Sequence, residues 1–412
     1  MSGKAILLLM MGFSMLFLVV ANNFHGVSGQ MTDNYVDYFN ETTAYNIAVS
    51  GANLAANSVF TNPTWTDGYN QPYQNGTMNV SVTILDAFKN IRQIESVGSF
   101  NGKTSNVRVI IAPRNFASFA YYSVSEGSNI WWTDKDTVWG PFHTQDILRA
   151  YRKPTFMGSA SSKLGIQHFT SAALDAPYFH KGYQNGVNVE IPLDAVTSLK
   201  APSLAGGLYF DGNEAGKSTV YMQFENDNLL FRYNTTLPFD TLHLPTVAPN
   251  GLIFVENGTV RMKGTIRGAY SLAVSGTTSP RGSVYLDGDI VYETDPRINP
   301  ASTDLLGIIA QKQVLITDAP PNYTDINIHA SILVQDEGFG AENHSGRPVS
   351  GNLNLLGGIQ QNIRKAVGTF NSGTGVYLSG FAKNYRYDER LGFASPPFYP
   401  GTGGFEIVSW YE

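Results

Sequence analysis

The stretch AILLLMMGFSMLFLVVA, residues 5–21, carries no charge across seventeen residues and follows the basic residue Lys4. Extended through Phe24, it reaches the ~20 residues that a membrane-spanning helix needs. A cleaved secretory signal peptide is the alternative, because the small residues at 27–29 provide a cleavage point before Gln30. Both interpretations place the rest of the chain outside the cytoplasm.

The pattern after this run favours one continuous helix. Apolar and small residues recur mostly at three- and four-residue steps from Met31 to Ala55, and no proline occurs before Pro63. Gly26 and Gly29 are the weak points, each costing roughly 1 kcal/mol in a helix interior. An unbroken helix to residue 60 would be roughly 80 Å long at 1.5 Å per residue. Its N-terminal half would need lipid or neighbouring copies to cover it.

The composition excludes several classes of site. The chain has 412 residues and no cysteine, so it is long enough for two or more domains and has no disulfide, thiolate metal site or cysteine nucleophile. The net charge is −6 and only 15% of residues are charged. Nucleic-acid binding needs clustered Lys and Arg, so we expect no nucleic-acid partner.

The middle region, 61–248, changes to short alternating runs bounded by turn residues, which predict a β-sheet or sandwich. One stretch, 85–96, looks helical. Strands are expected at 79–84, 105–112, 116–124, 187–191, 207–210, 219–224 and 229–233.

In region 249–376, short apolar units beside Gly, Asn or Asp recur roughly every 10 to 20 residues, which suits the coils of a parallel β-solenoid. A sandwich is the alternative. The aromatic tail, 377–412, is expected to form a cap, and residues 1–60 form the helical segment. The predicted fold class is mainly β with one long N-terminal α-helix, a β-sheet or sandwich middle region and a parallel β-solenoid-like C-terminal region.

A candidate ligand site lies in residues 130–144, where three of the five Trp gather. Indole faces stack on sugar rings, and the neighbouring carboxylates and imidazole are possible cation ligands. The alternative, which we favour, is a β-hairpin whose Trp residues fill a core and whose turn is 133–136. The candidate ligand residues are Trp131, Trp132, Asp134, Asp136, Trp139 and His143.

Catalytic and cofactor motifs are not found in the sequence. The seven His show no His-x-x-x-His spacing, and no Gly-x-Ser-x-Gly elbow occurs. Residues 212–218 imitate a phosphate-binding loop but have three residues between their glycines where that loop has four, so we expect a polar hairpin turn. No catalytic residue, metal or cofactor is therefore predicted, and we expect a non-enzymatic protein.

The N-terminal pattern resembles the type IV pilin superfamily, whose members have a short leader ending in Gly, an apolar half-helix, and an amphipathic half leading to a globular head. Met1-Ser2-Gly3 is similar to such a leader. Cleavage after Gly3 would leave Lys4 first and Leu8 fifth, whereas major pilins begin with Phe or Met and carry Glu fifth. The resemblance implies leader processing at Gly3 and Lys4, and places the chain nearer to minor-pilin-like proteins.

Several further blocks resemble uncharacterised bacterial envelope proteins with a pilus-assembly-like N terminus and a solenoid-like body. The blocks are 43–57, 140–144, 288–297, 304–310, 355–361 and 385–391. This resemblance implies no transferable activity.

These patterns favour a non-enzymatic cell-envelope structural protein, either a pilin-like subunit of a filament or a membrane-anchored surface protein. Its partners would be the membrane and copies of itself or other pilin-like subunits. It would be anchored in the inner membrane before assembly, with its β-rich part periplasmic or at the cell surface. The alternative is a secreted carbohydrate-binding or carbohydrate-active β-solenoid with a polysaccharide partner. That alternative predicts cleavage near Gly29 and carboxylates or aromatics along one solenoid face.

Overall fold

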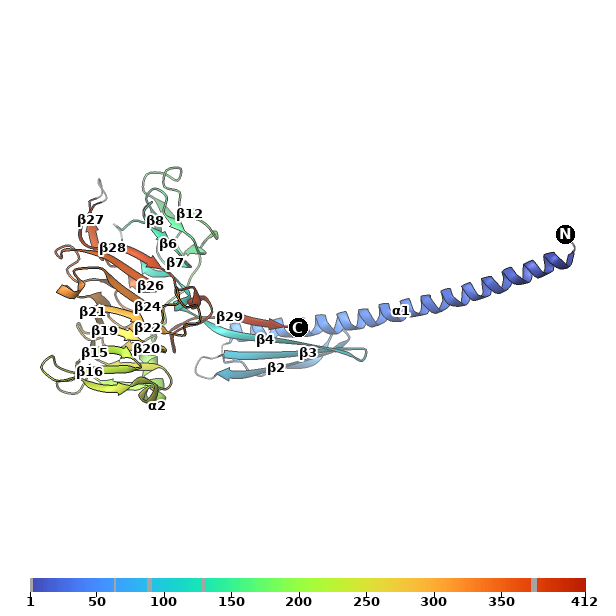
Figure 1. Ribbon diagram of the computed structural model, residues 1–412, viewed down its shortest axis with the longest axis horizontal. Helices are drawn as coiled ribbons and strands as arrows, with labels where there is room; N and C mark the ends of the chain where they lie inside the picture. The colour runs from blue at the N-terminus through green and yellow to red at the C-terminus, as the bar shows by residue number, and fades with distance from the viewer. Residues whose placement is uncertain (1–2, 63, 87–90, 128–129, 372–375) are drawn as a thin grey trace. The chain divides into compact units, whose positions relative to one another are not determined.

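The computed structural model describes residues 3–62, 64–86, 91–127, 130–371 and 376–412 (Figure 1). It is mainly β with one long N-terminal helix, which confirms the predicted fold class. The chain divides into two compact units. The first runs from the N-terminus to Pro113 and includes Phe405–Glu412, and the second is Arg114–Gly404. The four domains expected from the sequence, 1–60, 61–248, 249–376 and 377–412, remain a prediction.

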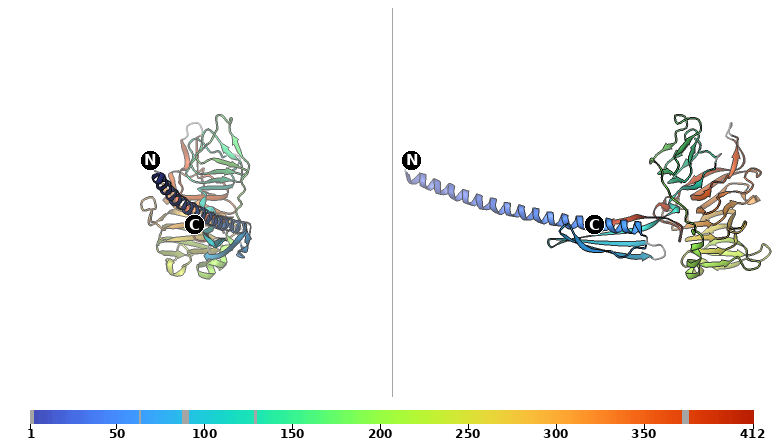
Figure 2. Two further views of the ribbon diagram at one scale, coloured as in Figure 1. Left: turned by 90° about the vertical axis from the view of Figure 1, so that its right-hand side faces the viewer. Right: turned by 180° about the vertical axis from the view of Figure 1, so that it is seen from behind.

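Helix α1 (Gly3–Thr61) contains 59 residues and runs without a break in all three views (Figure 1; Figure 2). Gly26 and Gly29 lie within it and do not interrupt it. Its buried side chains begin only at Asn40 and recur at three- and four-residue steps to Val59. Helix α1 therefore has a packed C-terminal third and an N-terminal part whose side chains are all exposed, with contacts to the sheet only near its end, where Asp37 pairs with Lys103 and Phe39 lies against Phe100.

The packed part of α1 lies on an antiparallel sheet. The strands are β1 (Tyr69–Tyr73), β2 (Gly76–Asp86), β3 (Ile91–Phe100), β4 (Lys103–Asn115) and β29 (Gly401–Tyr411), in that order across the sheet. Because β4 and β29 are neighbours, the second unit is inserted in the sequence between two adjacent strands of the first.

Helix and sheet approach closely through glycine. A Cβ atom on Gly98 would lie 2.1 Å from the carbonyl oxygen of Ala44, and one on Gly51 would lie 2.4 Å from Ser96 Oγ. The helix predicted at 85–96 was wrong, because 85–86 belong to β2 and 91–96 to β3, while 87–90 lie outside the described residues. Alternate side chains of β3 face α1, so burial with period two prevailed over local helix propensity.

The second unit is built on a long parallel ladder. Its strands, in spatial order, are β14 (Leu208–Asp211), β18 (Leu252–Glu256), β20 (Ala269–Val274), β22 (Leu305–Ala310), β24 (Ile326–Val334), β26 (Val349–Ile363), β5 (Tyr121–Ser125), β7 (Phe142–Thr144), β10 (Ala160–Ser162) and β13 (Tyr183–Asn185). The middle region is thus β-rich as predicted, and its strands continue the same stack as the later strands because β5 pairs with β26.

One column of aligned side chains shows how the stack buries its core. A single register position on each strand of the ladder points into the same apolar cluster. In spatial order these residues are Leu208, Ile253, Leu272, Ile308, Ile332, Ile359, Tyr121, Phe142, Ala160 and Tyr183. Each coil therefore covers the apolar side chain of the next, so short apolar runs are enough to build a continuous core.

A second parallel ladder forms another face of the stack. Its strands are β15 (Thr219–Asn226), β19 (Thr259–Ile266), β21 (Ser283–Tyr292), β23 (Gln313–Ile316) and β25 (Phe339–Ala341). The smaller parallel sets are β6 (Thr137–Val138), β9 (Thr155–Phe156) and β12 (Tyr178–Phe179), and β8 (Leu148–Ala150) with β11 (Ile166–His168). Strands that are not consecutive in the sequence thus pair in parallel in both ladders, and a β-solenoid remains a prediction for region 249–376.

The remaining elements are four strands and short helices. Strands β16 (Asn228–Arg232), β17 (Asp240–His243) and β27 (Gly368–Phe370) have antiparallel partners. Strand β28 (Tyr377–Arg386) pairs antiparallel with β27 and in parallel with β26. The helices are α2 (Lys200–Gly206), α3 (Leu244–Val247) and the 3₁₀ turns η1 (Phe116–Ser118), η2 (Thr197–Leu199), η3 (Pro320–Asn322) and η4 (Glu389–Gly392).

Four other local predictions for the middle region were wrong. Residues 187–191 form no strand, and 116–118 form a 3₁₀ turn before β5. Neither 212–218 nor 130–144 is a hairpin. Residues 212–218 link β14 to β15, and these two strands pair with β18 and β19. Within 130–144, Trp132 forms a parallel bridge to Ala150. In a coiled stack, consecutive strands belong to different faces, so a tight polar turn is a corner between ladders.

Candidate functional site

The first candidate site is the N-terminal part of α1. All side chains from residue 3 to 39 are exposed, including the apolar run 5–21, where Leu8 is 71% and Phe17 is 71% exposed. By length and composition this helix could cross a membrane. A signal sequence near an N-terminus has the same length and composition. Gly3 and Lys4 occupy its first turn, and they remain a proposal for leader processing.

Beyond the apolar run, a second exposed stripe follows one face of α1. Phe24, Val27, Met31, Tyr35 and Tyr38 are each more than half exposed and are spaced by three or four residues. Side chains at this spacing lie on the same side of a helix. The stripe is an apolar surface that no described residue of the chain covers.

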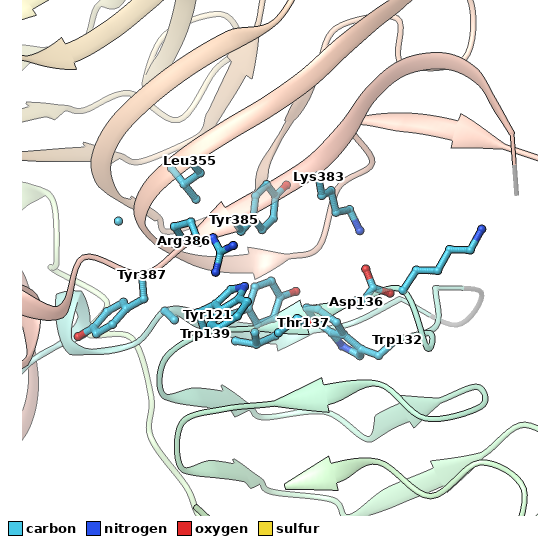
Figure 3. Close-up of a pocket in the computed structure, with 14 residues that line it drawn as sticks. Tyr121, Trp132, Asp136, Thr137, Trp139, Leu355, Lys383, Tyr385, Arg386 and Tyr387 are labelled. Atoms are coloured by element: carbon cyan, nitrogen blue, oxygen red, sulfur yellow. The ribbon is translucent and has the colours of Figure 1, made fainter. Parts of the chain in front are cut away.

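The second candidate site is a small pocket in the second unit, with a volume of about 50 Å³ (Figure 3). Three of the six ligand candidates, Trp132, Asp136 and Trp139, line it together with Lys383 and Arg386 of β28. The Arg386 guanidinium lies over the Trp139 ring at 3.9 Å from its centroid. The Asp136 carboxylate accepts hydrogen bonds from the backbone N–H and hydroxyl of Thr133, at 2.8 and 3.1 Å.

Lys383 is the unusual group of this pocket. It is the register partner of Leu353, whose own partner is Ile326, so it stands in a column that other coils fill with apolar side chains. Its side chain is exposed to solvent and also lines the pocket. The surrounding protein, and then the charge of Arg364, lower the pKa of Lys383. Among the described residues, no carboxylate lies within ion-pair distance of its ammonium group.

Beneath the pocket, a buried ion pair joins distant parts of the chain. Glu126 is fully buried, and its Oε2 atom lies 2.8 Å from Arg364 Nη1. The same carboxylate accepts hydrogen bonds from Tyr121 Oη at 2.8 Å, Trp132 Nε1 at 2.8 Å and the Ser123 hydroxyl. The guanidinium of Arg364 also lies 4.1 Å from the Trp132 ring centroid. This network fixes Trp132 as a wall of the pocket.

The other three candidates lie elsewhere. Trp131 packs edge-on against Phe169, with 5.0 Å between ring centroids, and Asp134 pairs with Arg152 at 3.2 Å. His143 is fully buried, and burial lowers its pKa to about 4.

His143 has polar and aromatic neighbours. Its Nδ1 atom lies 2.8 Å from Ser161 Oγ, and its ring stacks on Tyr122. In the part of the chain that the structure describes, no three His, Asp or Glu side chains group as metal ligands. Of the six residues, three thus line the pocket, Trp131 makes an aromatic contact, Asp134 forms an ion pair and His143 is a buried imidazole.

Sequence reasoning missed Glu126, Arg364, Lys383 and Arg386. Glu126 and Arg364 are 238 residues apart in the chain, and no local pattern marks either. The sequence held only a weak indication of Lys383, a charged residue within the run that forms β28. The pocket offers cationic and aromatic groups in a volume suited to water or a small polar group, and among the described residues lining it no nucleophile and base stand paired for catalysis.

No family model matches this chain, and no curated protein matches it. Among solved structures it is similar to the competence-associated pilin ComZ from Thermus thermophilus. The two chains are 12% identical, the alignment covers 90% of this chain and 97% of that one, and the TM-score is 0.37. A TM-score below 0.5 does not establish a shared overall fold.

Proposed function

We propose that this protein is a non-enzymatic, pilin-like subunit of the cell envelope. The N-terminal part of α1 anchors it in the inner membrane and then packs against other subunits, while the β-rich units lie on the periplasmic side or at the cell surface. The observation that carries this proposal is the exposed apolar run 5–21 at the end of one unbroken helix whose other end is packed into a folded unit.

The apolar run supports the membrane part of the proposal. Fully burying one Leu, Phe or Met side chain is worth about 1.5–3 kcal/mol, and the run consists mostly of such residues with every side chain exposed. Leaving it in water would therefore be strongly unfavourable. A bilayer supplies the missing apolar surroundings, and Lys4 at the start of the helix fits the excess of basic residues on the cytoplasmic side.

The length of the exposed helix supports the assembly part. Residues 3–39 extend for roughly 55 Å at 1.5 Å per residue, whereas a hydrocarbon core is about 30 Å thick. A spanning segment that ends at Phe24 therefore leaves the rest of the stripe, from Val27 to Tyr38, outside the hydrocarbon core. Because this stripe is apolar and continuous on one side of α1, neighbouring helices of the same kind are its proposed cover.

The anchor is tested with Phe17→Asp and the matched control Phe17→Leu. An Asp near the middle of a spanning helix costs about 2.5–3.5 kcal/mol, so membrane retention after an alkaline wash should fall about 100-fold or more for the Asp variant only. Equal retention of the two variants would refute the anchor. Mass spectrometry of the mature N-terminus distinguishes a pilin-like subunit from a secreted protein. Pilin-type processing gives a chain that starts at Lys4, and secretory cleavage gives one that starts at Gln30.

Assembly is tested with single cysteines, which are unambiguous because the chain has none. Tyr35→Cys places a thiol on the stripe, and Asp33→Cys places one on the opposite side of the same helical turn. In native membranes, a short bismaleimide should link Tyr35→Cys into dimers more efficiently than Asp33→Cys. If neither variant, or both alike, forms dimers, the stripe is not an interface.

A further inference from the structure

A column of polar side chains crosses one outer face of the second unit. It takes one outward position from each of six consecutive parallel strands, β15, β19, β21, β24, β26 and β28, which follow one another from bottom to top in Figure 1. The six residues are Gln223, Lys263, Asp289, Asn327, Asn354 and Asn384. Strands lie about 4.8 Å apart, so the column spans roughly 24 Å.

One end of this column lies in a groove. Two shallow hollows, of about 370 and 520 Å³, lie on β15, β19 and β21 and share Gln223 and Lys263 in their walls; together they are called the groove. The register of β19 and β21 shifts opposite Lys263, and a Cβ on Gly288 of β21 would lie 3.8 Å from Lys263 Cβ, at ordinary van der Waals contact.

The charges in the groove balance. Its walls carry three cationic side chains, Arg232, Arg261 and Lys263, and three anionic ones, Glu225, Asp287 and Asp289. Arg261 binds Asp287 through two hydrogen bonds of 2.9 and 2.6 Å. Among the described residues the Lys263 ammonium has no ion-pair partner. A groove of zero net charge has no electrostatic preference for a polyanion, but it is rich in groups that hydrogen-bond to neutral ligands.

The rest of the column is an ordered row of amides. Asp289 accepts hydrogen bonds from the Asn327 backbone and side chain at 2.8 and 3.0 Å, and the amides of Asn354 and Asn384 continue the chain at 3.2 and 2.7 Å. Each amide has further donors and acceptors beyond these bonds. Because the row is held in place, it presents them at a regular spacing with little ordering cost on binding.

Aromatic rings flank the polar column: Tyr221 and Phe239 line the groove, and Tyr285 stands beside it as the register partner of Arg261. Tyr221, Arg261 and Tyr285 are register partners on β15, β19 and β21, so they stand side by side facing outward. Arg261 lies 5.5 Å from the Tyr285 ring centroid, and Arg232 lies 4.3 Å from the Phe239 ring centroid. The groove therefore combines aromatic surface with planar polar groups.

We propose that this face binds an extended, uncharged glycan chain, which lies across the strands with its hydroxyl groups on the polar column and its ring faces against the aromatic side. A regular row of hydroxyl-binding groups roughly 24 Å long suits a polymer of repeating polyhydroxylated units better than a compact ligand. Charge neutrality selects a neutral chain over an acidic one. The proposal does not depend on whether α1 anchors the protein in a membrane.

The test is retention of the full-length protein in detergent by insoluble cellulose, chitin and xylan. Lys263→Met removes the unpaired ammonium while keeping side-chain length, and Lys181→Met is the matched control on an exposed lysine outside the groove. Losing one charge-assisted hydrogen bond should lower retention of the Lys263→Met variant about tenfold or more. The Lys181→Met variant should be retained like the unaltered protein.

Three outcomes would overturn the proposal: no retention of the unaltered protein by any of the three polymers, equal retention of both variants, or salt-sensitive binding restricted to a polyanion such as dextran sulfate. Circular dichroism of both variants confirms that each is folded. A second variant, Tyr285→Ala, removes aromatic surface without changing charge and should also weaken retention.

Discussion

The buried pair Glu126–Arg364 is predicted to be essential for the stability of the second unit, because it sits where β5 meets β26. The informative change is Arg364→Met, which keeps a long apolar stem against Trp132 and removes the guanidinium. The side chain of Arg364 is 5% exposed and that of Glu126 is fully buried. The variant therefore leaves a carboxylate without its cation in a place that water does not reach.

The expected loss of stability follows from that geometry. Breaking a buried ion pair by removing one partner costs about 3–5 kcal/mol, which is a change of about 150- to 5,000-fold in the folding equilibrium. Three neutral donors, Tyr121, Ser123 and Trp132, remain on the carboxylate. They reduce the cost but do not supply a charge. The double variant Glu126→Gln/Arg364→Met removes both charges and should recover most of the loss.

The assay is urea unfolding of the full chain in detergent, followed by tryptophan fluorescence. Trp132 lies against Arg364, and three of the five Trp belong to the second unit, so the signal reports on this region. The Arg364→Met midpoint should fall with an unchanged slope. A midpoint equal to that of the unaltered protein, or a double variant as unstable as the single one, would refute the reasoning.

Three further predictions concern packing, pH and surface charge. Gly98→Val should lower the free energy of unfolding by about 1–3 kcal/mol or more, and with it the urea midpoint, because its Cβ would lie 2.1 Å from the Ala44 carbonyl oxygen. An unchanged midpoint would show that α1 does not pack there. The free energy of unfolding of the unaltered protein should fall by up to about 3 kcal/mol between pH 6.5 and pH 4. In this range the unfolded chain protonates His143 at its ordinary pKa, whereas the buried His143 of the folded protein, with its pKa lowered to about 4, stays neutral. This stability is present above pH 6.5 and is lost on acidification, so His143→Gln should flatten the pH profile, and equal profiles would contradict the assignment. Lys103→Ala should leave the thermal midpoint unchanged, because its partner Glu41 is 64% exposed and such surface pairs contribute little; a clear drop in the midpoint would show otherwise.

The ligand candidates show where local sequence is informative and where it is not. The gathering of aromatic residues in 130–144 marked Trp132 and Trp139, which do line a pocket. The opposite wall of that pocket is β28, and nothing in the sequence near Lys383 or Arg386 connects them with the Trp residues. Similarly, the sequence alone contains Gln223, Lys263 and Asp289 as unrelated polar residues, and only their register on β15, β19 and β21 aligns them.

The sequence by itself determined the elements whose signals are local. The charge-free run 5–21 and the three- and four-residue steps after it predicted α1, since helix periodicity depends on near neighbours. Alternation bounded by turn residues predicted the β class for the same reason. These signals do not require knowledge of which distant residues meet.

Only the tertiary structure decided which strands pair. The pairing of β5 with β26 joins parts of the chain more than 230 residues apart, and the insertion of the second unit between β4 and β29 is equally non-local. A parallel strand presents the same backbone groups to any partner, so its own residues do not specify the choice. The choice is made by how well all the side-chain columns bury one another once the whole stack has formed.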